Sequence, residues 1–344
     1  MMTPAYAAKT CTALQAARKM KTGMVACAAL MSVAAALFST AALAQAYPAK
    51  PIRLILPSAP GGGTDITARI VARALADGLG VQTVVDNRPG ASGRIGTELA
   101  AKAAPDGYTL LLGGVTPLAT IPAGVPKIGY DPLKDFVPIS LVAISDYVLV
   151  AHPSLPVKTV KELVALARSK PGQINYASVG NLSGAHVAGE LLKQLAKIDV
   201  VHVPYNGGGP AARAVLSGEV SFYFSSGPTA IPYVNAGKLR AIASAGSKRH
   251  KAFPSLQTIS ETLPGHEATQ WYGVLAPAGT PNDIVSRLYA EIVREINKPN
   301  VAGQIAATGA DPMVSNSPQE FSAYIKREIT KWSKVVKASG VTAD

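Results

Sequence analysis

Short runs of β-forming residues alternate with longer amphipathic stretches from residue 47 almost to the C-terminus. The β-type runs cover residues 53–56, 82–85, 109–112, 147–151, 175–177, 200–203, 221–224, 241–245 and 272–276, and the helical patterns cover 65–78, 95–103, 159–169, 184–196, 210–217, 282–297 and 318–338. Alternation of this kind indicates α/β layers with largely parallel sheets. The roughly 300 residues that follow residue 46 suggest two domains.

The first 44 residues have the pattern of a signal peptide that directs export to the periplasm. Four basic residues precede an apolar core at 24–38, and two A-x-A sites follow it, Ala42-Leu43-Ala44 and Ala44-Gln45-Ala46. We expect cleavage at one of them. The alternative is an uncleaved anchor, but this core is short and rich in alanine for a membrane span.

Cysteine content and charge narrow the function classes. Cys11 and Cys27 both lie in the signal segment, so the mature chain can have neither disulfides, nor thiol catalysis, nor thiolate metal sites. Removal of the segment lowers the formal charge from +12 to +8. This excess is scattered along the chain, so we expect it to attract anions rather than nucleic acid.

A glycine-rich segment at residues 57–65 joins the first β-type run to the first helical pattern. It reads Pro57-Ser58-Ala59-Pro60-Gly61-Gly62-Gly63-Thr64-Asp65. Glycines before a helix let backbone N–H groups converge, and the helix N-terminus adds partial positive charge. These properties favour a cradle for a small anion. A tight turn capped by Thr64 or Asp65 is the alternative.

Three later loops share this chemistry and also follow β-type runs. They lie at residues 113–117, 178–184 and 204–210. Ligands of open α/β sheets bind at the carboxyl ends of strands, where such loops gather. Several glycine-rich, hydroxyl-bearing turns at one edge therefore predict a ligand cleft more strongly than any single turn.

The positions of two β-type runs suggest where the chain passes between two lobes. We place one crossing near Tyr147–Ala151 and a return crossing near Trp271–Ala276. The expected division is lobe 1 at residues 45–149 and 270–344, and lobe 2 at 150–269. Two crossing strands would form a hinge, with the ligand cleft between the lobes.

Catalytic motifs are absent, so we expect a protein that is not an enzyme and needs no cofactor or metal. A dinucleotide-dependent oxidoreductase is the competing hypothesis, because a strand, glycines, a helix and then Asp86 follow in order. The fingerprint G-x-G-x-x-G is missing there, and Asp65 would face the pyrophosphate. His186 and His202 are expected to be structural residues.

From Tyr47 to Asp344 the sequence resembles the Bug, or TctC-like, family of extracytoplasmic solute receptors. Segments that carry the resemblance include Pro60-Gly61-Gly62-Gly63-Thr64-Asp65, Asn87-Arg88-Pro89-Gly90-Ala91, Pro105-Asp106-Gly107-Tyr108-Thr109-Leu110, Tyr130-Asp131-Pro132-Leu133-Lys134-Asp135-Phe136 and Ala276-Pro277-Ala278-Gly279-Thr280-Pro281. The resemblance implies a two-lobed periplasmic-binding-protein fold (type II-like) that closes over one small carboxylate. It also implies the membrane permease subunits of a tripartite transporter as partners, or a sensing role without a transporter. We expect a monomer.

Backbone N–H groups and hydroxyls of both lobes are the ligand contacts that the resemblance implies. The predicted binding residues are Ala59, Gly62, Gly63, Thr64, Asp65, Thr116, Ser178, Gly180, Ser183 and Ser225, with Tyr205 and Trp271 as secondary candidates. Three departures change the expected cleft, and one of them alters the usual Ser-Thr-His around Thr116-Pro117. Ser58 replaces a usual aromatic residue and Ser225 replaces a usual aspartate, which favours a more anionic or an aromatic acid as ligand.

Overall fold

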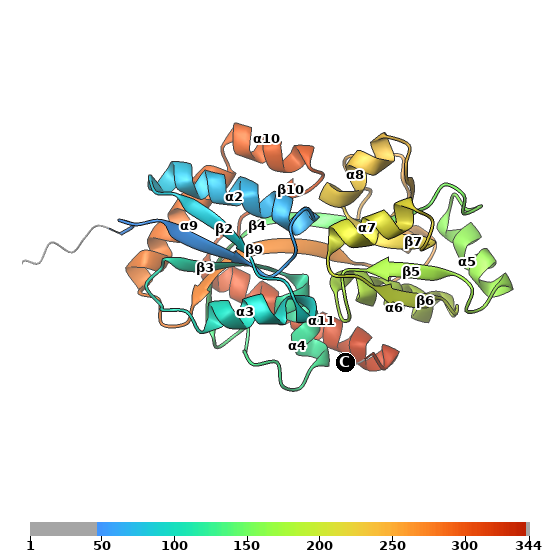
Figure 1. Ribbon diagram of the computed structural model, residues 1–344, viewed down its shortest axis with the longest axis horizontal. Coiled ribbons are helices and arrows are strands. Elements are labelled where there is room, and N and C mark those ends of the chain that lie inside the picture. Colours follow the sequence, from blue (N-terminus) through green and yellow to red (C-terminus); the bar gives the residue numbers. More distant parts are fainter. Residues whose placement is uncertain (1–46, 342–344) are drawn as a thin grey trace, which may run out of the picture. The chain divides into compact units, whose positions relative to one another are not determined.

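The computed structural model describes residues 47–341, so the expected signal peptide lies outside the described residues. Residues from Lys50 onward form one compact unit (Figure 1). Its strands are β1 (Ile52–Leu56), β2 (Thr83–Asn87), β3 (Thr109–Gly114), β4 (Phe136–Ala151), β5 (Asn175–Ser178), β6 (Val201–Pro204), β7 (Phe222–Ser226), β8 (Arg240–Ser244), β9 (Thr269–Pro277) and β10 (Asp311–Pro312).

Helices follow most of the strands, as the sequence predicts. The α-helices are α2 (Gly63–Leu79), α3 (Arg94–Ala101), α4 (Ile121–Gly124), α5 (Val160–Ser169), α6 (Gly184–Ala196), α7 (Gly208–Leu216), α8 (Gly227–Asn235), α9 (Asn282–Ile296), α10 (Pro299–Ala307) and α11 (Pro318–Ser339). Short non-α turns are η1 (Ala91–Gly93), η2 (Thr116–Thr120) and η3 (Ile259–Glu261). The sequence patterns did not predict α8, which starts with Gly-Pro and carries Pro232 inside it.

The strands are arranged in the order β2-β1-β3-β9-β4-β7-β5-β6, with β8 and β10 also paired to β4. Parallel pairing occurs on both flanks, between β1 and its two neighbours and between β5 and its two neighbours. The prediction of largely parallel sheets is wrong in the middle, where β9 and β4 run antiparallel to their neighbours. A chain that leaves one sheet and later returns to it has to run back in the opposite direction.

Strand β4 belongs to two sheets. Its first part, as far as Asp146, pairs with β9, and its last part, from Tyr147, pairs with β7 and β8. The return crossing lies next to this point, because the N–H of Ala268 bonds to Ala245 O at 2.8 Å while Thr269 pairs with Asp146. The sequence predicted only the last part of β4, since Pro138 and a register shift beside it interrupt the first part.

Helix α11 packs against strand β4 and against two helices, α4 and α6, which accompany the first and the second sheet respectively (Figure 1). Trp332 on this helix and Trp271 on β9 are both fully buried. Their indole N–H groups donate to the same oxygen of Glu328, at 3.1 and 3.2 Å. A buried carboxylate with two such donors is well solvated by the protein.

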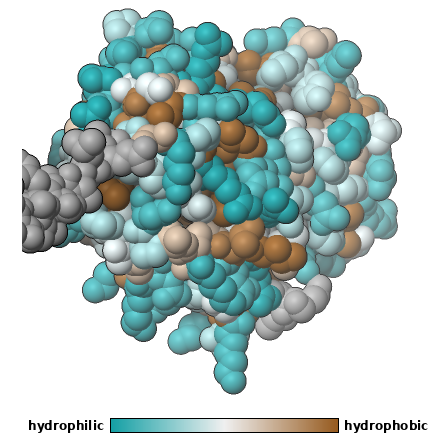
Figure 2. Space-filling model, turned by 60° about the vertical axis from the view of Figure 1, so that its left-hand side comes forward, coloured by the Kyte–Doolittle hydropathy of each residue, from teal (hydrophilic) through white to brown (hydrophobic). Residues whose placement is uncertain are grey.

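Hydrophilic residues dominate the face shown in Figure 2, and hydrophobic residues occur there in separate groups. Exposed large apolar side chains lie in separate parts of the chain, such as Ile95 in α3, Leu133 before β4 and Met313 just after β10. Within residues 47–341, no helix combines the length and the apolar character that crossing a membrane requires.

Candidate functional site

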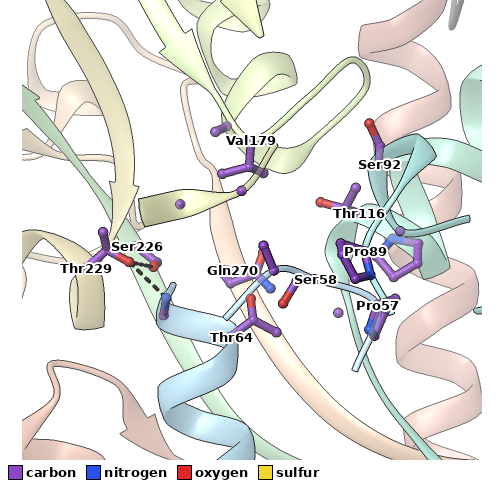
Figure 3. A pocket seen from close by; sticks show the side chains of 18 of the residues that line it. Pro57, Ser58, Thr64, Pro89, Ser92, Thr116, Val179, Ser226, Thr229 and Gln270 are labelled. Carbon is purple, nitrogen blue, oxygen red and sulfur yellow. Dashed lines mark hydrogen bonds between the residues drawn. The ribbon is translucent and has the colours of Figure 1, made fainter. Parts of the chain in front are cut away.

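A cavity of about 300 Å³ lies where loops from the two sheets meet (Figure 3). The loop after β1 contributes Ser58 and the first turn of α2 contributes Thr64. From the other side, the loop before α7 contributes Asn206 and α7 contributes its first residue, Gly208. The residues that line it include no Asp, Glu, Lys, Arg or His. An anion bound in this cavity would therefore be held by neutral donors.

Two helix N-termini lie next to each other at the cavity. Helix α2 starts after Gly62 and helix α7 starts after Gly207, and neither has a side-chain cap. A Cβ on Gly62 would lie 3.5 Å from the backbone N of Gly208, so the two turns are in contact. Uncapped first turns leave N–H donors and partial positive charge for a bound anion.

The start of α2 is linked to α8 through hydroxyl groups. The N–H of Gly63 donates to Thr229 Oγ1 at 2.9 Å, and Thr229 Oγ1 lies 3.3 Å from Ser226 Oγ (Figure 3). A Cβ on Gly63 would collide with Ser226 Oγ. Glycine is therefore required there for close packing. Ser226 and Thr229 both line the cavity.

A side-chain hydroxyl without a partner lies on the cavity wall. The Oγ of Ser58 is buried and has no hydrogen-bond partner among the described residues. Ser58 lies beside Thr64 and Gln270 in the close view (Figure 3). A buried hydroxyl without a partner costs free energy, so a ligand oxygen at this place would satisfy it.

Two tyrosines complete the wall as neutral groups. Burial raises the pKa of Tyr147 and of Tyr223 far above the ordinary range, so both phenols stay protonated. The hydroxyl of Tyr147 donates to Gln270 Oε1 at 2.9 Å. The Gln270 amide in turn donates to Trp271 O at 3.1 Å. This chain of bonds fixes the orientation of Gln270 in the cavity.

Thr116 connects the first sheet to the start of α6. Its Oγ1 accepts a hydrogen bond from the N–H of Gly184 at 3.2 Å. Ser183 caps the same helix, since its Oγ accepts from the N–H of His186 at 3.2 Å. The first turn of α6 is thus satisfied by hydroxyl groups of the protein itself.

Asp65 orients the glycine-rich loop. Its carboxylate accepts from the N–H of Gly61 at 3.0 Å, from Asn87 at 3.0 Å, and from Arg69 at 3.1 Å. Burial opposes ionisation of this group, but these donors outweigh burial and hold the pKa of Asp65 below its usual value. Asp65 is therefore an ionised carboxylate that is already neutralised within the loop.

Four of the ten predicted binding residues line the cavity, namely Ala59, Gly63, Thr64 and Thr116. Gly62 and Asp65 lie directly behind them, in the N-cap and first turn of α2. On the other side, Ser183 caps α6, and Gly180 lines a second cavity described below. Ser225 is buried in β7, and its neighbour Ser226 lines the cavity instead.

Ser178 belongs to a buried polar cluster behind the loop that precedes α6. Its Oγ lies 2.6 Å from His202 Nε2, and the rings of His202 and His186 stack at 3.6 Å. Burial lowers the pKa of His186 to about 4 and of His202 to about 3. Neither histidine lines the cavity. Among residues 47–341, no group of acidic, histidine or cysteine side chains is arranged to hold a metal ion.

Sequence reasoning missed several cavity residues. Ser226 and Thr229 belong to the unpredicted α8 region, and Gln270 adjoins Trp271, which was a secondary candidate. The loop at residues 204–210 was recognised as glycine-rich, yet only Tyr205 was named from it, as a secondary candidate. Alternation along β7 gave a signal for Ser226, because neighbouring strand residues face opposite sides.

Comparison with known proteins agrees with this architecture. The sequence model of a protein family described as the tripartite tricarboxylate transporter family receptor matches residues 67–341 of this chain. Protein BugT of Bordetella pertussis is 38% identical over 299 residues, which span 86% of this chain and 91% of BugT.

Two solved structures are similar over nearly their whole length. One is R. palustris Rpa4515 with adipate, at 33% identity and a TM-score of 0.83, covering 86% of this chain and 99% of that chain. The other is MatC from Rhodopseudomonas palustris with bound malate, at 32% identity and a TM-score of 0.80. The match covers 84% of this chain and 100% of that chain.

These likenesses confirm the expected fold class, the two-lobed fold of periplasmic binding proteins with a hinge of crossing strands. They also match the expected family, whose members are extracytoplasmic solute receptors. The chain therefore belongs to the tripartite tricarboxylate transporter receptor family, known as the TctC or Bug family.

Proposed function

We propose that this protein is a periplasmic receptor that captures a small organic acid and delivers it to the permease subunits of a tripartite tricarboxylate-type transporter. It acts as a monomer, without cofactor and without catalysis. The observation that carries the proposal is the cavity between loops of the two sheets, where hydroxyl groups and helix N-termini converge and no charged side chain is present.

Carboxylate binding fits the chemistry of this cavity. Ser58 offers an unpaired hydroxyl, and the first turns of α2 and α7 offer backbone N–H groups. Neutral dipoles stabilise a buried anion when each of its oxygens finds a donor. Two relatives with the same fold were solved with adipate and with malate, both of which are dicarboxylic acids.

Ligand capture would use the division into lobe 1 (residues 45–149 and 270–344) and lobe 2 (150–269). Contacts between the two sets of loops support a closed arrangement. Ser92 Oγ donates to Asn181 O at 2.7 Å, and a Cβ placed on Gly62 would lie 3.5 Å from the backbone N of Gly208. A ligand that contacts both sets of loops would stabilise this closed state, and opening at the β4 crossing would release it.

The environment of Asp86 does not support the competing hypothesis of a dinucleotide-dependent oxidoreductase. Asp86, the candidate ribose ligand, is already engaged by the guanidinium of Arg53 at 2.6 Å and by that of Arg88. Both arginines hold the pKa of Asp86 below its usual value, although burial opposes this. A dinucleotide would have to displace these pairs.

A thermal-shift screen of the protein without its signal segment tests the proposal. The panel contains small mono- and dicarboxylates and aromatic acids, with NAD as the control. A carboxylate at about 100 times its Kd adds roughly 2.7 kcal/mol to the unfolding free energy and raises Tm by several degrees. Stabilisation by NAD alone would contradict the receptor function. Uptake measured with and without the permease subunits separates transport from sensing.

A further inference from the structure

A second cavity adjoins the first and contains an arginine. It has a volume of about 250 Å³, and Ser92 and Asn206 line both cavities. The second cavity is also lined by Arg94, the first residue of α3, and by Tyr205. The boundary between the two cavities is therefore formed by Ser92 of η1 and by Asn206 of the loop before α7.

No carboxylate within residues 47–341 forms a direct ion pair with Arg94, although Glu98, whose pKa is lowered mainly by Lys102 and also by Arg94, lies near enough to sense its charge. The Nε of Arg94 is buried and has no hydrogen-bond partner in the described part of the chain. Its terminal nitrogen makes one long contact, 3.5 Å to Lys127 O. The guanidinium forms no ion pair within residues 47–341, because Glu98, one turn further along α3, is paired with Lys102 instead.

The two cavities differ in a way that suits a ligand with two charges. The first provides only neutral donors, which can satisfy one carboxylate. A second carboxylate buried on the same ligand needs stronger compensation, and a guanidinium binds a carboxylate through two parallel N–H groups. Apolar wall residues Pro89 and Val179 line the first cavity and would contact a hydrocarbon chain.

We propose that Arg94 forms a subsite for the distal carboxylate of a linear α,ω-dicarboxylic acid, whose proximal carboxylate binds among the neutral donors of the first cavity. The inference rests on the proposed receptor function and defines its substrate class. Arg94 would then be a specificity-determining residue. It would increase the affinity for a ligand with a second carboxylate and leave the affinity for a monocarboxylate of the same length unchanged.

Calorimetric titration tests this with linear dicarboxylates of about four to eight carbons and the monocarboxylates of equal length. The proteins are wild type, Arg94→Gln, Arg94→Lys and Arg73→Gln. Arg73 is exposed on α2, so its replacement controls for the loss of one positive charge. Arg94→Lys keeps the charge and removes the bidentate geometry, and it serves if the glutamine variant folds poorly.

We expect wild type to prefer the dicarboxylate of best length over the matching monocarboxylate by about tenfold or more. Arg94→Gln should remove that preference while monocarboxylate affinity stays the same, and Arg94→Lys should retain part of it. Equal losses for both ligand types, or an unchanged preference in Arg94→Gln, would overturn the subsite and leave the receptor function standing. Absence of binding by every acid in wild type would overturn both.

Discussion

The hydroxyl of Thr116 accepts the N–H of Gly184 at 3.2 Å, and this bond joins the start of η2, just after β3 in the first sheet, to the start of α6 beside the second. Gly184 has no room for a side chain, since a Cβ there would collide with the hydroxyl of Tyr147. The neutral hydroxyl of Thr116 thus holds a helix N-terminus that a ligand anion would otherwise bind. In the lobe division proposed above, this bond would connect the two lobes and would break if the cleft opened.

Replacement of Thr116 by valine keeps the shape and removes the acceptor. The N–H of Gly184 then lacks its partner, and we expect the unfolding free energy to fall by about 1–3 kcal/mol. Chemical denaturation measures this loss. The control is Thr330→Val, whose hydroxyl bonds to Lys326 O on an exposed helix surface. An equal effect of the two substitutions would show that the Thr116 bond has no special weight.

Replacement of Ser58 by alanine should separate ligand affinity from stability. The Ser58 hydroxyl has no partner among residues 47–341, so its removal leaves the unfolding free energy of the ligand-free protein equal or slightly higher. If the hydroxyl donates to a bound carboxylate, affinity falls by about tenfold. Calorimetry and thermal unfolding on the same sample measure both quantities. Unchanged affinity would remove Ser58 from the site.

Replacement of Gly63 by alanine should disturb the cavity without harming the helix itself. The new Cβ would collide with Ser226 Oγ and lie 3.2 Å from Thr229 Oγ1, which breaks the link between α2 and α8. We expect carboxylate affinity to drop by at least about tenfold. Gly303→Ala is the matched control in α10, because a Cβ there meets nothing within 4 Å. That control should stabilise the protein by about 0.5–1 kcal/mol.

Asp146, at the crossing point of β4, should give the protein a measurable pH dependence. Burial raises the pKa of Asp146 to about 6, with help from Asp311 and Glu267 and against Lys251. The folded chain therefore binds this proton more tightly than the unfolded chain between about pH 4 and 6. Stability from this group is present at the acid end of the window and is lost as pH rises through it.

Denaturation of wild type and Asp146→Asn at several pH values measures this effect. Between about pH 4 and pH 7, the unfolding free energy of wild type should fall by roughly 1–3 kcal/mol relative to that of Asp146→Asn. The lower part of this range reflects the partial exposure of the carboxyl group. Contributions of the buried histidines cancel in the difference. Asp77→Asn, an exposed carboxylate on α2, controls for charge removal. Parallel curves for wild type and Asp146→Asn would contradict the raised pKa.

The sequence predicted the elements near the site well and the long-range pairing less well. Ser183 and the helix after it follow from local capping chemistry, which acts within one turn. The first part of β4 was missed because Pro138 breaks the local pattern, and only its pairing with β9 defines it. Antiparallel pairing in the middle depends on where the chain returns, which periodicity does not reveal.

The candidate site residues show the same contrast between local sequence patterns and long-range packing. Gly63, Thr64 and Thr116 line the cavity because they end strands or begin helices, a position that sequence can recognise. Gln270 and Thr229 line it through tertiary packing alone, since each comes from a segment without a turn motif. The proposed role of Arg94 was not foreseen either, because the absence of a direct ion pair to it is visible only when the surrounding carboxylates have been located.

Strand β4 has a consequence for how proteins of this architecture diversify. Its 16 residues extend roughly 50 Å and supply backbone partners to both sheets. Neither half can be exchanged with the half of a relative without cutting through a hydrogen-bonded ladder. Recombination of whole lobes is therefore disfavoured, and we expect new ligand preferences to arise by point substitution of residues that line the cavities.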